Sequence, residues 1–360
     1  MGLHELELRN FRLFREFRFV PDRDAITVLL SPNGTGKTSV LEAVYALATA
    51  SSFRTSTASD MIHSGALVAE VHGVLFQRER RVQVDLTLTK NARNTTKRML
   101  VNGQRPQSRS DLASVLPLTV FTPEGVDIVR QGPENRRAFL THLMTDVDLS
   151  TGDVVERFTR ILSQRNALLR ALQGDRPTPV QRDELDVWTH DLSLVSDELV
   201  TVRRKVLDDL TPLVAQFYEQ LACDDLHVGI NYEQSWEGDL FSALRRYLDD
   251  DRFRGHTTIG PQRDDIALTL DDRDARRQAS QGEQRSLALA LRLGGHALVQ
   301  QFRGIDPLLL LDDVFSELDP SRSDRLLKLL PAGQTLVTTA SPLPSGMSPA
   351  AVIDLSTVRS

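Results

Sequence analysis

The residues best suited to chemistry form one glycine-rich loop, Ser-Pro-Asn-Gly-Thr-Gly-Lys-Thr-Ser, at positions 31–39. Gly34 and Gly36 allow the backbone to curl until several N–H groups face one point, and a helix that begins there adds its partial positive charge. Such a point binds an anion, for example a phosphate chain. Lys37 would then reach the β- and γ-phosphates of a nucleotide, and Thr38 would offer its hydroxyl to Mg²⁺.

The surroundings of the loop agree with this interpretation. Residues 25–31 are an apolar run typical of a buried strand, and residues 39–50 carry apolar side chains at helical spacing. Ser31 replaces the first glycine of the pattern GxxxxGK[ST], but this position only opens the loop and serine is small, so we expect it to be tolerated. A glycine-rich turn without a ligand is the alternative. The predicted nucleotide-binding residues are Ser31, Pro32, Asn33, Gly34, Thr35, Gly36, Lys37, Thr38 and Ser39.

Two carboxylates have the position that such a site requires. Asp312 and Asp313 follow four consecutive leucines, which is typical of a strand buried on both faces. Asp312 suits the shell of Mg²⁺, through a water and together with Thr38, whereas Asp313 would orient and deprotonate an attacking water. The predicted catalytic residues are therefore Lys37, Asp312 and Asp313. Two acids that merely cap the strand are the alternative.

Two short segments near these aspartates are further candidates. The first precedes a helix rich in leucine and alanine, so its serine hydroxyl and the helix N-terminus make a second corner for an anion. An ordinary helix cap would look the same, but the place of this segment about thirty residues before the aspartates favours a functional role. The first segment is Ser280, Gln281, Gly282, Glu283 and Gln284, and the second, after the aspartates, is Ser316, Glu317, Leu318 and Asp319.

The elements that must position these residues fall into two sheet-rich ends and a helical middle. Residues 3–8, 16–20 and 82–89 alternate as strands do, and residues 334–341 are an apolar run typical of another buried strand. We expect three parts: residues 1–123, the N-terminal part of the head; residues 124–251, a helical lobe; and residues 252–360, the C-terminal part of the head.

The helical middle predicts a hairpin. Residues 154–173 have helical spacing, Gly174–Pro179 break the helix, and the return segment has apolar residues at alternating three- and four-residue spacing, which is a coiled-coil seam. Pro212 should limit this second helix. An antiparallel arm that projects from the head is one interpretation, and an ordinary helical subdomain is the other. The seam residues are Leu185, Trp188, Leu192, Val195, Leu199, Val202 and Val206.

Composition restricts the class of protein. The formal net charge is −6, so any contact with nucleic acid must come from a local basic patch. Such patches are the segment Arg78–Arg109 and the arginines that alternate with phenylalanines over residues 9–19; either is a solvated sheet face or a surface that follows phosphates. The single cysteine, Cys223, fits a reducing cytosol, and we expect a cytoplasmic protein without a membrane segment. The eight histidines are scattered, without an HxH or HExxH pattern, so we do not expect them to bind a metal.

In this order the loop, SQGEQ, LLLLDD and SELD resemble the ABC-type ATPase heads, a class that includes transporter motors, SMC proteins and their repair relatives. The resemblance implies an α/β fold, an ATPase head of mixed sheets and flanking helices with an inserted helical lobe and a short antiparallel coiled-coil arm. It makes residues 280–284 the signature motif and residues 316–319 the D-loop. It also implies a composite site, in which Ser280 of one chain contacts the γ-phosphate held by Lys37 of a second copy, so that ATP joins two heads.

Over nearly its whole length the chain is similar to the RecF family of bacterial recombination mediators. The resemblance rests on LRNFR at 8–12, SSFRT at 51–55, FTPEGVDIV at 121–129, GPENRRAFL at 132–140, TTIGPQRDD at 257–265 and LLLLDDVFSELD at 308–319. It implies ATP and Mg²⁺ as cofactors, a homodimer that forms on DNA when ATP binds, and weak DNA-stimulated hydrolysis that releases it. It further implies work with RecR and RecO to load RecA at single-strand gaps. Thr338 or Thr339 stands where transporters carry a histidine, which implies slow hydrolysis.

Three alternatives remain open at this point. A transporter motor would have its loop and signature closer together in sequence and would lack the segments at 51–55 and 257–265. An SMC-like head that works with a nuclease would need a longer arm or a separate nuclease subunit. A non-catalytic clamp would bind ATP and DNA without DNA-stimulated phosphate release.

Overall fold

The computed structural model describes residues 2–77, 80–108, 111, 114–173, 178–222 and 224–355. Some sequence predictions fall outside these described residues. They concern Cys223, the ends of the basic segment at Arg78 and Arg109, and the turn residues 174–177 of the hairpin.

A parallel five-stranded sheet forms the centre of the molecule, with the order β13-β3-β12-β11-β7. β11 and β12 are buried along their whole length, as expected of strands covered on both faces. Because all five strands run in the same direction, their carboxyl ends meet at one edge, where α/β proteins place their sites. The strands are β3 (Ile26–Leu30), β7 (Leu118–Phe121), β11 (Leu308–Asp312), β12 (Thr335–Thr339) and β13 (Ala351–Asp354).

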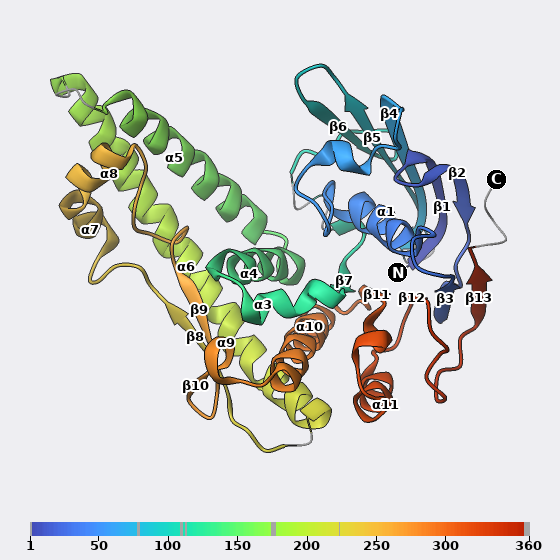
Figure 1. Ribbon diagram of the computed structural model, residues 1–360. Coiled ribbons are helices and arrows are strands. Elements are labelled where there is room, and N and C mark those ends of the chain that lie inside the picture. The colour runs from blue at the N-terminus through green and yellow to red at the C-terminus, as the bar shows by residue number, and fades with distance from the viewer. Residues whose placement is uncertain are drawn as a thin grey trace.

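An antiparallel sheet lies against the other side of α1 (Lys37–Thr49), so that this helix is held between two sheets (Figure 1). The strand order is β2-β1-β4-β5-β6. The approach is close, because a Cβ atom on Gly73 of β4 would lie 2.5 Å from Leu47 Cδ1 of α1. The strands are β1 (Gly2–Phe11), β2 (Phe14–Phe19), β4 (Val68–Gln77), β5 (Arg80–Lys90) and β6 (Thr95–Val101). The alternating segments at 3–8, 16–20 and 82–89 are thereby confirmed as strands.

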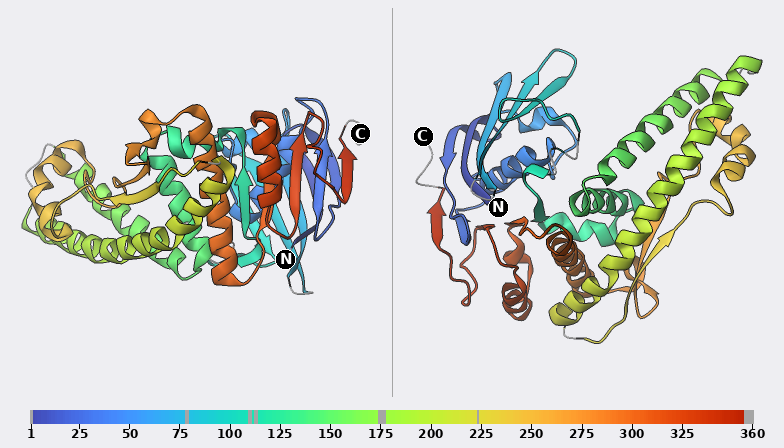
Figure 2. Two further views of the ribbon diagram at one scale, coloured as in Figure 1. Left: turned by 90° about the horizontal axis from the view of Figure 1, so that it is seen from below. Right: turned by 180° about the vertical axis from the view of Figure 1, so that it is seen from behind.

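The helical lobe lies on the opposite side of the central sheet, and its long helices extend away from both sheets (Figures 1 and 2). A small antiparallel sheet, β10-β9-β8, is part of this lobe. Its helices and strands are α3 (Asp127–Arg130), α4 (Pro133–Val147), α5 (Thr151–Ala171), α6 (Pro179–Ala222), β8 (Val228–Glu233), α7 (Leu240–Arg246), α8 (Leu248–Arg254), β9 (Asp265–Leu270), β10 (Arg273–Asp274), α9 (Ala275–Gln278) and α10 (Gln281–Arg303). The remaining helices are α11 (Pro320–Leu329) and the 3₁₀ turns η1 (Ala58–Met61), η2 (Pro123–Val126) and η3 (Val314–Glu317).

The predicted hairpin of α5 and α6 is present, but a coiled-coil arm is not confirmed. A coiled coil buries one narrow stripe of each helix. On α6 most of the predicted seam is buried, and a second row that includes Val200, Arg203 and Leu207 is buried as well. This wider burial arises because α10, α7 and β8 also pack against α6. The hairpin therefore belongs to a helical subdomain, which was the alternative interpretation.

The prediction that Pro212 limits the second helix is wrong, because α6 continues through it to Ala222. A proline inside a helix costs about 3 kcal/mol through its missing N–H and its steric clash. Here the flanking Leu210 and Val214 are completely buried against α10. The two helices are so close that a Cβ on Gly294 would lie 2.9 Å from Val214 Cγ2. Tertiary packing offsets the local cost.

Of the two predicted divisions of the chain, the second falls inside the helical lobe, whereas the first lies close to the start of that lobe. The division after residue 251 falls inside α8, whose Asp251 is completely buried in the helical lobe. β9 pairs with β8 in that lobe, so residues 265–274 lie with the helices. β7 ends at Phe121, and the lobe follows directly, close to the predicted division at residue 123.

The arginines near the N-terminus do not gather on one basic surface. Arg12 points to Glu42 of α1, whereas Arg9 lies beside Glu16 and Glu70 on neighbouring strands. Arg18 pairs with Glu5. The outer face of this sheet thus carries both charges, as a solvated sheet face does.

Candidate nucleotide site

Two glycines with positive φ shape the loop between β3 and α1. Gly34 has φ 80° and Gly36 has φ 104°, in the region that side chains rarely adopt. Gly36 also caps α1, and a Cβ there would lie 2.8 Å from Cζ of Phe14. The β1–β2 turn therefore packs directly on the loop, and only glycine fits at this contact.

The ammonium group of Lys37 is enclosed by the loop itself. Its side chain is buried, and Nζ donates to Ser31 O at 2.7 Å, Pro32 O at 3.1 Å and Asn33 Oδ1 at 3.4 Å. These acceptors are all neutral, and no ion pair joins Lys37 to a carboxylate among the described residues. A buried cation beside a helix N-terminus, with its charge uncompensated, fits an anionic ligand.

Ser31 contributes its backbone. Its N–H donates to Thr339 O at 3.3 Å and its carbonyl accepts from Lys37. The hydroxyl is buried and has no hydrogen-bond partner. That serine is tolerated in the place of the glycine stays a prediction.

The structure brings Thr38 and Asp312 together from positions far apart in the sequence. Thr38 Oγ1 donates to Asp312 Oδ1 at 2.9 Å, and Thr338 Oγ1 donates to the same oxygen at 2.7 Å. Burial raises the pKa of Asp312, and the neighbouring Asp313 raises it further, while the two hydroxyls and Arg54 oppose this. Hydroxyl and carboxylate oxygens are hard ligands, which Mg²⁺ prefers, so this pair fits a magnesium ion.

Asp313 lies at the same edge in a left-handed conformation, with φ 48°. Its N–H donates to Thr338 Oγ1 at 3.0 Å, and its Oδ1 accepts from the N–H of Ala340 at 3.2 Å. Thr338 therefore contacts both aspartates. Thr339 instead donates to Ser341 O at 3.0 Å, so of the two threonines Thr338 is the one that hydrogen-bonds to the aspartates, and its role at the position of the transporter histidine stays a prediction.

The predicted signature segment lies at the start of α10, where Ser280 is an exposed helix cap. Its hydroxyl accepts from Glu283 N at 3.2 Å, and the Glu283 side chain accepts from Ser280 N, which completes a capping box. Gln284 is buried, accepts from Arg130 Nε at 2.7 Å and donates to Ala275 O at 3.0 Å. The segment is held rigidly. The Ser280 hydroxyl only accepts in this capping box, so its proton can still be donated to another acceptor.

The predicted D-loop packs beside this helix. Glu317 pairs with Arg285 of α10 at 2.8 Å, and Asp319 caps α11 by accepting from Arg322 N at 2.9 Å. Ser316 donates to Asp313 O. Residues 316–319 thus connect the carboxylate edge to α10 within one chain.

Proteins of known family resemble the chain over almost its whole length. The family model of the RecF/RecN/SMC N-terminal domain matches residues 2–342. The DNA replication and repair protein RecF of Acidothermus cellulolyticus is 33% identical over 354 residues, which cover 95% of this chain and 94% of the relative. The protein of the same name from Geobacter sulfurreducens is 36% identical over 340 residues, which cover 92% and 90%.

The chain belongs to the RecF family.

Solved structures agree with this family. The recombination mediator protein RecF with ATP, of the RecFOR pathway, superposes with a TM-score of 0.87 at 25% identity, over 98% of this chain and 94% of the other. The SMC head bound to the C-winged helix domain of ScpA has a TM-score of 0.54 at 16% identity, which shows the fold alone, over 95% of this chain and 90% of the other. The α/β fold of an ABC-type head with an inserted helical lobe is confirmed.

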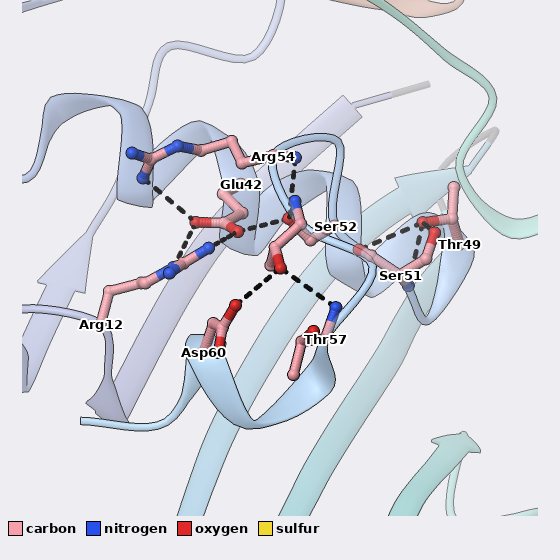
Figure 3. Close-up of polar contacts among 9 residues, drawn as sticks. Arg12, Glu42, Thr49, Ser51, Ser52, Arg54, Thr57 and Asp60 are labelled. Carbon is pink, nitrogen blue, oxygen red and sulfur yellow. Dashed lines mark hydrogen bonds and ion pairs between the residues drawn. The ribbon is translucent and has the colours of Figure 1, made fainter. Parts of the chain in front are cut away.

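In this RecF-family chain the structure adds residues to which the sequence assigned no role. β7 ends at the same edge as its four neighbours, and it is followed by Thr122, which caps η2, and by Glu124 within η2. Arg54, quoted above only within a family motif, lies near Asp312. It joins Arg12 at the buried Glu42 of α1 (Figure 3). An isolated arginine or glutamate carries no pattern, so only the fold could reveal this cluster.

Two absences concern the described residues only. None of the described helices has the length and the apolar composition needed to cross a bilayer. In the same part of the chain no three histidine, cysteine, aspartate or glutamate side chains are placed to hold a metal ion.

Proposed function

We propose that this RecF-family protein binds ATP with Mg²⁺ and acts in DNA replication and repair. One observation carries the proposal: Thr38, beside the uncompensated Lys37, is joined to Asp312 at the carboxyl end of the four-leucine strand. Loop N–H groups and Lys37 would hold the phosphates, with residues 31–39 as the cradle, and Thr38 and Asp312 would hold Mg²⁺. The ATP-bound RecF structure in the same fold supports this assignment.

The site is proposed to be completed by a second copy. Ser280 and the loop around Lys37 are on different sides of the central sheet, and the described hydrogen bonds and ion pairs do not join them. An exposed serine at the N-terminus of α10 can donate to a phosphate presented by another molecule. Residues 280–284 and the D-loop residues 316–319 would then face the partner, and ATP would join the dimer.

Hydrolysis is proposed to release this dimer. Asp313 would orient and deprotonate the attacking water, Lys37 would stabilise the phosphates, and Asp312 would help by holding Mg²⁺ beside them. Thr338 occupies the position beside both aspartates. A threonine, unlike a histidine, has no proton-transfer function near neutral pH, so slow hydrolysis that acts as a timer is expected.

DNA is proposed to lie between the helical lobe and the β5–β6 hairpin. Beyond residue 157 the charged residues of α5 are arginines, and Arg160 and Arg170 are exposed. The hairpin exposes Lys90, Arg93 and Arg98. Contacts to phosphates through these cations would be salt-sensitive and largely independent of sequence. By family, the protein would work in the cytoplasm with RecR and RecO to load RecA at single-strand gaps.

Sedimentation velocity tests the proposal directly. The protein is run with ATP, with ADP and without nucleotide, each with and without duplex DNA, and a dimer is expected only with ATP. Ser280→Arg should abolish the dimer and retain ATP binding by the monomer. Thr201→Arg, a matched change at an exposed hydroxyl on α6, should leave the dimer intact. Dimers of Ser280→Arg, or equal dimerisation with ADP, would contradict the composite site. DNA-stimulated phosphate release separates the ATPase from a non-catalytic clamp.

A further inference from the structure

Two arginines share one carboxylate on the helix that follows the phosphate loop (Figure 3). Glu42 is completely buried and lies four residues after Thr38 on α1. Residues four apart lie on one face of a helix, so Glu42 and Thr38 share the face that leads to the phosphate site. The arginines come from distant segments, Arg12 from the β1–β2 turn and Arg54 from the segment after α1.

Arg12 is fixed at this carboxylate. Its Nε donates to Glu42 Oε2 at 2.8 Å and its Nη2 donates to Oε1, which is a bidentate pair. Its backbone is held as well, because its N–H donates to Met61 O at 2.8 Å and its carbonyl accepts from His63 Nδ1 at 2.7 Å. Only 18% of the side chain is exposed. Arg12 therefore neutralises Glu42 and has little freedom to do anything else.

Arg54 is held loosely at the same carboxylate. Its Nη1 lies 3.6 Å from Glu42 Oε2, beyond hydrogen-bond distance, and 43% of its side chain is exposed. Its backbone is nevertheless anchored, since its N–H donates to Ser52 Oγ at 2.9 Å and that hydroxyl donates to Glu42 Oε1. The guanidinium can thus move while its Cα stays in place.

The charges at this cluster do not balance. One carboxylate faces two guanidinium groups, so one positive charge is left over, and Arg12 already satisfies both carboxylate oxygens. The surplus charge belongs to Arg54, which lies at Glu42, four residues after Thr38 on α1. A multivalent anion at the loop would compete with Glu42 for this guanidinium, because a phosphate accepts a bidentate arginine pair.

We propose that Glu42 is a positioning residue that holds Arg54 until a nucleotide binds. The phosphate chain of a nucleoside triphosphate then displaces Glu42 as the partner of Arg54, while Arg12 stays paired with Glu42. This inference rests on the proposed function. Because the triphosphate must displace Arg54 from Glu42, it would bind less tightly than it would to a protein in which Arg54 is free. The diphosphate, which has less charge and is shorter, would gain less from the exchange. Arg54 would thereby favour ATP over ADP, and Glu42 would limit the size of that preference.

The test measures dissociation constants for ATP and ADP by isothermal titration calorimetry in the Ser280→Arg background, so that dimerisation does not contribute. Arg54→Gln should weaken ATP about tenfold and ADP less than about twofold, as expected for one charge-assisted contact. Arg15→Gln, a matched change at an exposed arginine of β2, should leave the ratio of the two constants unchanged. Equal losses for ATP and ADP in Arg54→Gln would overturn the proposal.

Glu42→Gln tests whether Glu42 competes with phosphate for Arg54 or only supports the position of Arg54. If Glu42 competes with phosphate for Arg54, its neutral variant should raise the preference for ATP by roughly two- to fivefold, the range of a partly exposed ion pair. The same change in Arg54→Gln should have no effect on the preference. A lower preference in Glu42→Gln would overturn the proposal. If Glu42→Gln does not fold, the contrast between Arg54→Gln and Arg15→Gln still decides. If the parent binds neither nucleotide, the proposed function fails, and this inference fails with it.

Discussion

Acid should destabilise this protein through one buried histidine, His296 of α10. Its side chain is 1% exposed, its Nδ1 lies 3.2 Å from Thr119 Oγ1 of β7, and its Nε2 has no hydrogen-bond partner. Burial lowers the pKa of His296 from 6.5 to about 4, and Asp306 opposes this only in part. The neutral ring therefore contributes stability that is complete above pH 6.5 and is lost as pH falls toward 4.

The size of the effect follows from the two pKa values. At pH 5 the ring is almost fully protonated in the unfolded chain and mostly neutral in the folded one. Linkage then gives a loss of about 2 kcal/mol in the free energy of unfolding between pH 7 and pH 5. Other groups titrate in this range too, so the quantity to measure is the difference between wild type and His296→Gln, which removes this proton site.

Urea denaturation at pH 7 and pH 5 measures that difference. The advantage of wild type over His296→Gln should shrink by about 2 kcal/mol between the two values. His227→Gln, a matched change at an exposed ring, should give the same pH dependence as wild type. If His296→Gln and wild type lose equal stability within about 0.5 kcal/mol, the ring must be protonated in the folded state and the reasoning fails.

Three further predictions concern single contacts. Arg165→Ala leaves the completely buried Asp251 without its partner at 2.8 Å and should lower the free energy of unfolding by about 3–5 kcal/mol in urea denaturation. Arg157→Ala, at an exposed pair on the same helix, should lower it by less than about 1 kcal/mol. Gly36→Ala should reduce ATP affinity at least about tenfold in calorimetry, because its Cβ would meet Phe14, and Gly65→Ala, with φ 86° and open space, should not. Asp313→Asn should retain ATP binding and prolong the life of ATP-dependent dimers in sedimentation. The exposed Asp324→Asn should leave the life of these dimers unchanged. If dimers of Asp313→Asn dissociate at the wild-type rate, Asp313 is not the catalytic carboxylate.

Local patterns were sufficient for the elements that carry the site. Alternation, apolar runs and the glycine-rich loop each depend on neighbours in sequence, so β1, β3, α1 and β11 could be predicted. The meeting of Thr38 with Asp312 could also be expected, because parallel strands end at one edge. The choice between Thr338 and Thr339 could not, since it depends on which side chain of a fully buried strand points to the aspartates.

The helical middle shows where a seam pattern misleads. Three- and four-residue spacing records only that one stripe of α6 is apolar, and it does not tell how many elements cover the helix. Ser193, Ser196 and Arg203 are buried beside the seam although they are polar, because neighbouring elements surround the helix. For Arg203 these elements also supply a partner, Pro261 O. Pro212 misleads for the same reason, since its local cost is visible in sequence and the packing against α10 is not.

Charge is the property that the sequence conceals most, because pairing depends on contacts between distant segments. Four arginines near the N-terminus have similar surroundings in sequence, yet the fold gives them different functions: Arg18 pairs with Glu5 at the surface, and Arg12 turns inward to Glu42. Once Arg12 has neutralised Glu42, Arg54 is left in excess at this carboxylate, which lies four residues after Thr38 on α1. Net charge near zero or below therefore does not argue against an anion site, because what matters is the cation that the fold leaves without a full partner.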